Sequence, residues 1–284
     1  MLLKTLLESF RNRPSNRAKP HSFQQYECTV SRFGDFLDRK PEVRDITEQC
    51  LSDFTRWMEA QGSVSTANSK RQHLLTLAKF AVYKNLLRSV PQYTYHPEPP
   101  KRVPDSWHPH EVAAILKACD TQPACGGFTA KHWRLLVLLI YDTTARKNAV
   151  LQTLRSDVQN GNLRLDAKHQ KRNNEQWPDL SAEALALIAE LPESPDGRLF
   201  PWQYTQATLG RHFREIVERA GLQCGRRDLF QKLRRTAITQ TAIAHGVERA
   251  QIRAGHASQK QTWSAYLDVS KMPSACAAGI ARPV

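Results

Sequence analysis

The sequence predicts a mainly α-helical protein with one small antiparallel β-sheet, divided into two domains. Apolar residues recur at helical spacing through most of the chain. One Asn160-Gly161 pair lies between alternating apolar and polar residues, which is typical of a β-hairpin. Six prolines between residues 91 and 109 interrupt the helical pattern, because proline removes a backbone donor and restricts its neighbour. Together these observations favour two helical domains joined by an extended linker.

Residues 21–90 are expected to form a small helical domain. Residues 1–20 are interpreted as a short helix or a mobile N-terminal arm. Further along, Thr47 is a good cap for one helix, and Ser65 or Thr66 for the next. The apolar and aromatic stripes of these helices indicate a hydrophobic core rather than a cofactor site.

The proline-rich stretch 91–104 is predicted to be the linker, and the second domain to occupy 105–284. Residues 129–145 are apolar nearly all round, which is typical of a buried helix. The hairpin follows, with a possible third short strand at 175–180. Helices then resume, and Gly246 is expected to end one of them.

Composition favours a polyanionic partner. The 41 Lys and Arg residues outnumber 27 Asp and Glu, so the formal net charge is +14. Nucleic acid is the commonest polyanion, and a merely soluble basic protein is the alternative. The chain has neither an apolar run of membrane-spanning length nor a signal peptide at its start. Six scattered cysteines without a C-x-x-C pair disfavour a disulfide framework or zinc site and indicate a reducing cytoplasm.

Five motifs occur in a fixed order in the second domain. An arginine, Arg146, follows the buried helix in "LLIYDTTARKNAVLQTLRSDV", and Lys168 directly follows the hairpin strand. The stretch "QKLRRTAITQTAIAHGVERAQIRAGHASQKQTWSAYLDVS" adds Arg234, the Gly-His pair at His256, and Tyr266. Each motif is weak alone. In this order they resemble the two catalytic boxes of the tyrosine recombinases, the phage-integrase family, and the resemblance covers about residues 20–270.

Metal-free cleavage of a phosphodiester needs a nucleophile, cations on the non-bridging oxygens and an acid for the leaving oxygen. The resemblance implies that Tyr266 attacks the phosphate and forms a 3′-phosphotyrosyl link. It implies that Arg146 and Arg234 grip the phosphate, that His256 hydrogen-bonds it, and that Lys168 protonates the 5′-oxygen. No metal, ATP or other cofactor is implied. Tyrosine has an ordinary pKa of about 10, so it needs a base or a positive field.

Each residue also has an ordinary structural explanation. Arg146 could pair with Asp142 or Asp157, and Arg235 could replace Arg234 at the site. Lys168 could be a solvated hairpin lysine, with Lys171 as the acid instead. Likewise, His256 could be a helix-end residue and Tyr266 a half-buried aromatic. The order of all five motifs favours the catalytic interpretation.

Three departures from the family pattern concern activity. Gln231 stands where the family usually has histidine, and glutamine cannot exchange a proton at neutral pH. Ala149 replaces a frequent acidic residue, and the interval from His256 to Tyr266 is one residue longer than is commonest. We include Gln231 among the candidate site residues because its amide can hydrogen-bond a phosphate oxygen.

Double-stranded DNA is the expected partner, and the helical domain resembles the family's core-site binding domain. Basic residues in both domains are candidate phosphate contacts. The resemblance further implies a homotetramer on paired sites, held by the C-terminal tail, in a protein of bacterial or phage origin. The candidate contacts are Lys70, Arg71, Arg211, Arg214, Arg226 and Arg227.

The favoured function is a site-specific recombinase that integrates or excises a mobile element. Gln231 and Ala149 favour a second possibility, a DNA-binding protein of the same fold that has lost its chemistry. A third is a relaxase resembling the type IB topoisomerases. Formation of a covalent adduct distinguishes the second possibility from the others, and relaxation of supercoiled DNA identifies the third.

Overall fold

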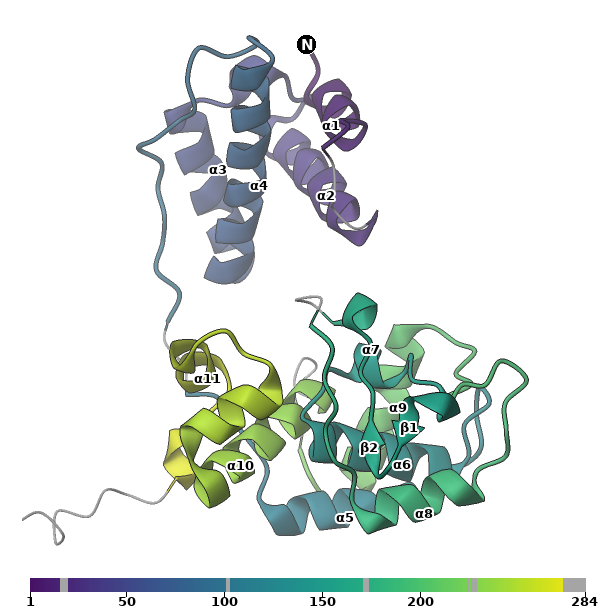
Figure 1. Cartoon of the computed structure of the whole chain (residues 1–284). Coiled ribbons are helices and arrows are strands. Elements are labelled where there is room, and N and C mark those ends of the chain that lie inside the picture. Colours follow the sequence, from purple (N-terminus) through teal and green to yellow (C-terminus); the bar gives the residue numbers. More distant parts are fainter. Residues whose placement is uncertain (16–19, 101–102, 171–173, 224, 226–228, 273–284) are drawn as a thin grey trace, which may run out of the picture. The chain divides into compact units, whose positions relative to one another are not determined.

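The computed structural model describes residues 1–15, 20–100, 103–170, 174–223, 225 and 229–272. It is mainly helical with a two-stranded antiparallel sheet (Figure 1), so the predicted fold class is confirmed. The chain separates into two compact units, Met1–Lys101 and Arg102–Val284. No helix of the described residues is long and apolar enough to cross a membrane.

Unit 1 is a bundle of four α-helices around its own core. Pairs of these helices pack together, among them α3 with α4 and α2 with α4. Phe33, Phe54 and Leu74 are fully buried at the centre. The elements are α1 (Leu3–Arg11), α2 (Pro20–Leu37), the 3-10 turn η1 (Val43–Asp45), α3 (Glu48–Ala60) and α4 (Val64–Tyr83).

The caps of unit 1 are partly as predicted. Thr47 caps α3 and accepts a hydrogen bond from the backbone N–H of Cys50. The predicted cap of α4 was wrong, because Ser63 accepts from the backbone N–H of Thr66. Ser63 is the last residue with extended backbone angles, so Ser65 already lies inside the helix.

The N-terminal segment is a helix and not an arm. Leu3, Leu6, Leu7 and Phe10 of α1 are buried in the core of unit 1. The backbone N–H of Leu3 donates to the carbonyl of Pro41, which holds the start of the chain against the loop after α2. Burial of one apolar face outweighs the tendency of a short terminal helix to fray.

The proline-rich stretch before residue 101 is part of unit 1, has an extended backbone and packs on α3 and α4. The Asn68 side chain donates to the carbonyl of Pro97 at 2.7 Å. The backbone N–H of Tyr95 donates to Ser52, and its hydroxyl donates to Glu59. The backbone groups that proline leaves without helical partners therefore find side-chain partners on α3 and α4.

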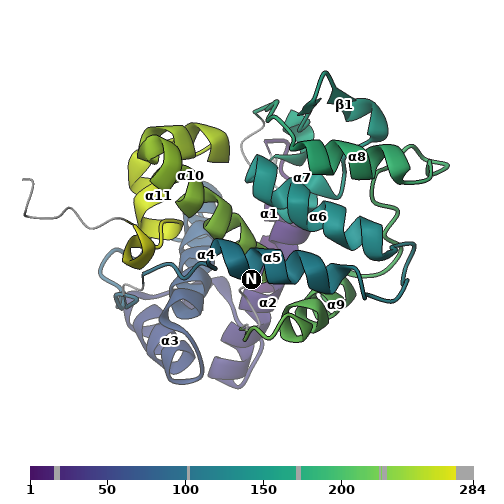
Figure 2. The same ribbon diagram turned by 90° about the horizontal axis from the view of Figure 1, so that it is seen from below.

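Unit 2 is built around the buried helix α6 (Ala130–Thr143). Trp133, Leu136 and Ile140 of this helix are fully buried, as the sequence predicts. Figure 2 shows α5 and α6 side by side, and α6 also packs against α8 and α10. The other helices are α5 (Pro109–Cys119), α7 (Lys147–Val150), α8 (Ala182–Glu190), α9 (Gln206–Arg219), α10 (Leu229–Ala254) and α11 (Gln259–Ala265), with a 3-10 turn η4 at Val269–Lys271.

The hairpin forms, but it is shorter than its alternating sequence indicates. Strand β1 (Val158–Gln159) pairs with β2 (Asn162–Leu163) around Asn160 and Gly161, both with positive φ. The possible third strand is represented by isolated bridges, Leu165 with Gln176 among them. The chain then turns into the 3-10 helix η3 (Ala167–His169), so Lys168 does not directly follow a strand as predicted. A carboxylate cap from Asp166 to the Lys168 backbone favours the turn.

Helix α10 contains the break expected at Gly246. This residue has φ 84° and ψ 162°, so two helical segments meet there at a kink. Only glycine adopts such angles without a Cβ clash. The first segment carries Gln231 and Arg234, and the second leads to His256.

Candidate active site

Arg234 is the buried centre of the candidate site. It is 2% exposed and lies on the first segment of α10. Its Nη1 donates to the carbonyl of Thr144, and its Nη2 donates to the carbonyl of Ala254 at 2.9 Å. Nη2 also lies 3.3 Å from Nε2 of His256. These partners come from the end of α6 and the end of α10, so the guanidinium joins two otherwise separate chain segments.

The hydrogen bonds of His256 indicate its tautomer. Because a guanidinium can only donate, Nε2 of His256 must accept from Arg234. Nδ1 then carries the proton and donates to Oγ1 of Thr262 at 3.0 Å. The histidine is 6% exposed. It therefore lies in the cluster and is more than a helix-end residue.

Tyr266 lies against both of these side chains. It follows α11 directly, and its ring centroid is 4.3 Å from that of His256. The guanidinium carbon of Arg234 lies 5.4 Å from the centre of the tyrosine ring. His256 and Tyr266 are ten residues apart in the sequence. Helix α11 lies between them and packs on α10, which brings the two rings together (Figure 1).

The surroundings of Tyr266 favour its ionised form. Burial raises the pKa of its phenol, but the charge of Arg234, a hydrogen bond with Gln231 and the nearby Arg146 lower it by more. The net result is a pKa below the ordinary value. Gln231 thus contributes a hydrogen bond at the phenol although it cannot take up its proton.

A pH titration of the phenol tests this electrostatic arrangement. Since the pKa of Tyr266 is lowered, we expect its phenolate to form at a lower pH than that of free tyrosine, about 10. The ultraviolet difference between wild-type protein and Tyr266→Phe measures this ionisation. Gln231→Ala should move the midpoint to higher pH. A wild-type midpoint at or above that of free tyrosine would contradict the arrangement.

Arg146 adds a second positive charge beside Arg234. It caps α7 and is half-buried. Burial, and after it the charge of Arg146, lowers the pKa of Arg234 to about 10, so the guanidinium group of Arg234 is still charged at neutral pH. Among the described residues, no acceptor meets the buried Nε of Arg234. Two adjacent positive charges, together with a buried N–H donor at Nε of Arg234 that has no acceptor among the described residues, form a site suited to binding an anion.

The carboxylates that the sequence offers as partners of Arg146 are occupied elsewhere. Asp142 accepts from the backbone and hydroxyl of Ser181, and Asp157 accepts from the backbone of Leu154. The chain reverses at Thr144, which has φ 51°. A β-branched residue in this region is strained, and such strain often occurs at functional sites. Here it turns the chain after α6 so that Arg146 reaches Arg234.

Lys168 is not part of the cluster in this structure. Its side chain is 70% exposed and forms an ion pair with Asp166 at 3.0 Å. The alternative, Lys171, lies outside the described residues. Ala149 is buried and supplies no charge. The structure therefore brings together Arg146, Gln231, Arg234, His256 and Tyr266, and leaves Lys168 apart.

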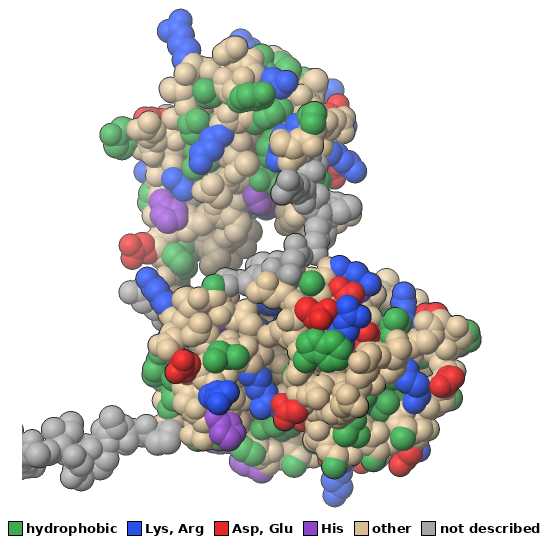
Figure 3. All heavy atoms as spheres, viewed as in Figure 1, with side chains coloured by type: hydrophobic (Ala, Val, Ile, Leu, Met, Phe, Trp, Pro, Cys, Tyr) green, Lys and Arg blue, Asp and Glu red, His purple; other side chains and the backbone are tan. Residues whose placement is uncertain are grey.

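The candidate DNA contacts differ in exposure. Lys70 is only 7% exposed, and Arg71 donates through Nε to Thr94, so both candidate contacts of unit 1 are less accessible than a solvated lysine or arginine. Arg211 is exposed and Arg214 half-buried on α9. Arg226 and Arg227 lie outside the described residues. Figure 3 shows Lys and Arg spread over both units among acidic residues on the face in view, and not gathered in one patch.

Thr262 is a site residue that the sequence interpretation missed. It is fully buried, and its hydroxyl is the partner of His256 Nδ1. A threonine four residues before a tyrosine in a short helix has no distinctive pattern. Nothing in the sequence could therefore have indicated it.

Replacing Thr262 with valine is expected to destabilise unit 2. The change keeps the shape and removes the hydroxyl that accepts from the buried Nδ1–H of His256, and loss of such a buried hydrogen bond costs about 1–3 kcal/mol. Urea unfolding measures the difference. Thr241→Val is the control, since the Thr241 hydroxyl donates to the carbonyl of Ala237 in its own helix. Equal stability of the two variants would show that the His256 bond contributes little.

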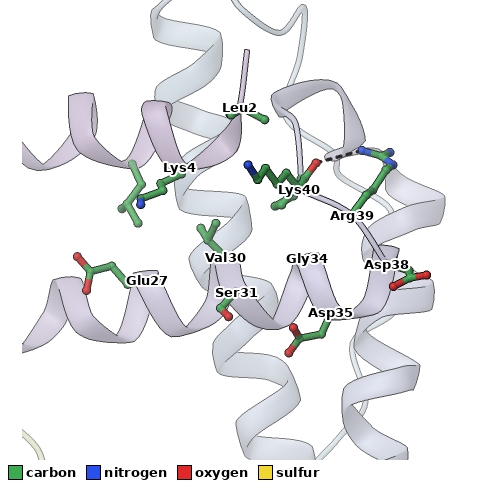
Figure 4. Close-up of a pocket in the computed structure, with 12 residues that line it drawn as sticks. Leu2, Lys4, Glu27, Val30, Ser31, Gly34, Asp35, Asp38, Arg39 and Lys40 are labelled. Atoms are coloured by element: carbon green, nitrogen blue, oxygen red, sulfur yellow. Dashed lines mark hydrogen bonds between the residues drawn. The ribbon is translucent and has the colours of Figure 1, made fainter.

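Unit 1 contains a groove that is unrelated to this cluster. It has a volume of about 650 Å³ and lies between α1 and α2 (Figure 4). Its lining mixes Leu7 and Val30 with charged groups such as Lys4 and Glu27. All of its lining residues belong to unit 1, whereas the residues of the cluster all belong to unit 2.

Comparison with known proteins shows the fold. No family model matches the sequence, and no curated protein matches it. A crystal structure of a lambda integrase (75–356) dimer bound to a COC′ core site superposes with a TM-score of 0.75 at 17% identity, covering 97% of this chain and 99% of that one. The XerH site-specific recombinase bound to difH in a post-cleavage complex gives 0.68 at 21% identity, with 92% and 78% covered.

A third structure extends this comparison. The Tn1549 transposon integrase in complex with a circular intermediate DNA has a TM-score of 0.73 at 14% identity, with 92% of this chain and 94% of that chain covered. This chain therefore has the tyrosine recombinase fold. At such low identity the likeness shows the fold alone, and the function has to be argued from the site.

Proposed function

We propose that this protein is a site-specific DNA recombinase that cuts and rejoins duplex DNA through a 3′-phosphotyrosyl intermediate. The observation that carries the proposal is the cluster of Arg234, His256 and Tyr266. These residues are far apart in the sequence, and the packing of α10 and α11 brings their side chains into contact. The fold adds support, because the three similar structures are recombinases or integrases in complex with DNA.

In the proposed reaction, Oη of Tyr266 attacks the phosphorus and the bond to the 5′-oxygen breaks. The phenol loses its proton to solvent water, and the positive charge of Arg234 and Arg146 favours this ionisation. The same two guanidinium groups stabilise the charge on the non-bridging oxygens. A 5′-hydroxyl of the partner strand then attacks the phosphotyrosine, which restores a phosphodiester and frees Tyr266. Each step replaces one phosphate ester by another, so the energy of the broken phosphodiester is kept in the phosphotyrosine and no ATP is consumed.

His256 is proposed to hydrogen-bond the phosphate from the centre of the site through a protonated Nε2, which requires phosphate binding to replace the contact of Nε2 with Arg234. Lys168 is proposed to protonate the leaving 5′-oxygen. For Lys168 this requires its exposed ion pair with Asp166 to open when DNA binds. An exposed ion pair of this kind contributes about 0–1 kcal/mol, so opening it costs little. Lys171 stays the alternative acid.

We propose integration or excision of a mobile element as the role, in a protein of bacterial or phage origin. The active form would be a homotetramer on two paired DNA sites. The C-terminal tail, proposed to link its subunits, lies outside the described residues. Arg211 and Arg214 are the proposed phosphate contacts of α9.

Trapping the covalent intermediate tests the proposal. A binding site is first selected from random-sequence duplex DNA, and nicked suicide duplexes are then built on it. We expect a covalent protein–DNA adduct whose linked peptide contains Tyr266, identified by mass spectrometry. A protein that binds the selected site and forms no adduct with nicks at any position would overturn the proposal.

That outcome would favour a DNA-binding protein without chemistry, the second candidate function. The observation in its favour is Gln231, an exposed amide that can hydrogen-bond Tyr266 but cannot act as a base. Adduct formation together with relaxation of supercoiled plasmid lacking paired sites would instead identify a topoisomerase-like enzyme.

A further inference from the structure

Asp268, two residues after Tyr266, is buried and fully hydrogen-bonded. It is 3% exposed. Oδ2 accepts from the backbone N–H of Ser106 at 3.0 Å and from its hydroxyl at 2.9 Å. Oδ1 accepts from the backbone N–H and hydroxyl of Ser270. Four donors on one carboxylate, with Lys271 at 3.4 Å, form a strong anchor.

The other end of this anchor is the start of unit 2. Ser106 lies 162 residues before Asp268 in the sequence, close after the proline-rich stretch. The next residue, Trp107, is 1% exposed, and its backbone N–H donates to the hydroxyl of Thr236. Asp105 forms an ion pair with Lys232. Residues 105–107 are therefore fastened to the same segment of α10 that carries Arg234.

The backbone of Tyr266 is tied to α10 as well. The hydroxyl of Thr239 donates to the carbonyl of Tyr266 and accepts from the backbone N–H of Asp268 at 3.1 Å. Thr239 is fully buried. The chain on the C-terminal side of the tyrosine is thus held at two successive points, first by Thr239 and then by Ser106.

We propose that Asp268 is a positioning residue that locks Tyr266 into the catalytic cluster of its own chain by anchoring it to Ser106. The inference rests on the proposed function and deepens it. We call the Asp268–Ser106 contact the latch. Ser106 lies where the chain enters unit 2, so through the latch the position of Tyr266 depends on the position of the end of the linker. Opening the Asp268–Ser106 contact would leave the backbone of Tyr266 held by Thr239 and loosen the tyrosine against Arg234, without altering Arg234 itself.

The charge of Asp268 is suited to this role. Its burial raises the pKa, but the hydrogen bonds from Ser270 and Ser106 and the charge of Lys271 lower it below the ordinary value, so the group is a carboxylate at neutral pH. An amide at this position would direct N–H donors at the donors of Ser106 or Ser270. Asp268→Asn therefore loses two of the four accepted hydrogen bonds and the ion pair with Lys271, which weakens the anchor while keeping the size of the side chain.

The test compares cleavage with binding in the full-length protein. A displacement of about 1 Å costs about 10²-fold in rate, so we expect Asp268→Asn to form adduct about 10- to 100-fold more slowly at saturating suicide DNA. Its affinity for the same duplex should change less than about twofold, because no proposed phosphate contact is altered. A rate within about threefold of wild type, with intact folding, would overturn the proposal.

Ser106→Ala provides a second variant with a smaller disturbance. It removes the hydroxyl donor and keeps the backbone N–H, so a decrease in the same direction and of smaller size is expected. Ser181→Ala is the control, since Ser181 donates its N–H and hydroxyl to Asp142 in the same way and also caps α8, so that this variant should be destabilised at least as much. If Ser181→Ala slowed the adduct as much as Ser106→Ala, the effect would be general destabilisation and the latch would be refuted.

A spectroscopic measurement separates this inference from the proposed function. In protein labelled with ¹³C at the tyrosine ring, the signal of Tyr266 is the one lost in Tyr266→Phe. Loosening of the tyrosine against Arg234 should return the pKa of Tyr266 towards its ordinary value in Asp268→Asn. An unchanged titration would refute the latch even if wild type forms adduct. Absence of adduct from wild type would refute the proposed function while this titration still tests the latch.

Discussion

Tyr266→Phe is expected to bind the selected duplex as tightly as wild type and to form no covalent adduct. Phenylalanine fills the same space against His256 and Arg234, so the cluster keeps its packing. The change removes only the phenol oxygen, which is the atom that would join phosphorus.

Gel detection of the adduct on nicked suicide DNA measures the effect, with Tyr141→Phe as the control. Tyr141 is a half-buried tyrosine on α6 of the same unit, and burial raises the pKa of its phenol. Tyr141→Phe should form the adduct at the wild-type rate. An adduct with Tyr266→Phe, or its loss with Tyr141→Phe, would show that Tyr266 is not the nucleophile.

Arg234→Lys is expected to have the next largest effect. The guanidinium donates hydrogen bonds to the carbonyls of Thr144 and Ala254 at the same time, and among the described residues its Nε has no acceptor. A lysine ammonium is a single point and cannot reproduce this fork. Loss of one preorganised donor to a reacting oxygen typically costs about 10²–10³-fold in rate, and we expect a decrease of that size in adduct formation.

The same change should also destabilise unit 2, because two buried carbonyls lose their donors, at about 1–3 kcal/mol each before relaxation. Rates are therefore compared well below the unfolding temperature and at saturating DNA. Arg235→Lys is the control on the same turn of α10. If Arg234→Lys retained activity within a few-fold of Arg235→Lys, Arg234 would not be the phosphate ligand.

The sequence was informative wherever structure depends on neighbouring residues. Apolar spacing predicted the helices of both units, Asn160-Gly161 predicted the hairpin turn, and Gly246 predicted the break in α10. Each of these signals acts over a few residues, through backbone angles or the period of a helix face. The cap of α4 was displaced to Ser63 because Ser, Ser and Thr compete within four positions.

Errors arose where pairing over longer distances was needed. Period-two alternation through Lys168 predicted a longer strand, but strand length depends on a partner, and pairing beyond Leu163 is reduced to isolated bridges. Lys70 is a candidate phosphate contact by sequence because lysine usually lies at the surface, whereas its burial depends on segments packed around α4.

By itself, the sequence determined the fold class, the order of the candidate residues and their resemblance to a recombinase site. Only the tertiary structure decided which of Arg234 and Arg235 is buried at the centre, which tautomer His256 adopts, and that Thr262 and Asp268 support the cluster. The physical reason is that hydrogen bonds between residues such as Arg234 and Thr144, or Asp268 and Ser106, depend on how helices pack. Such contacts leave no local pattern in the chain.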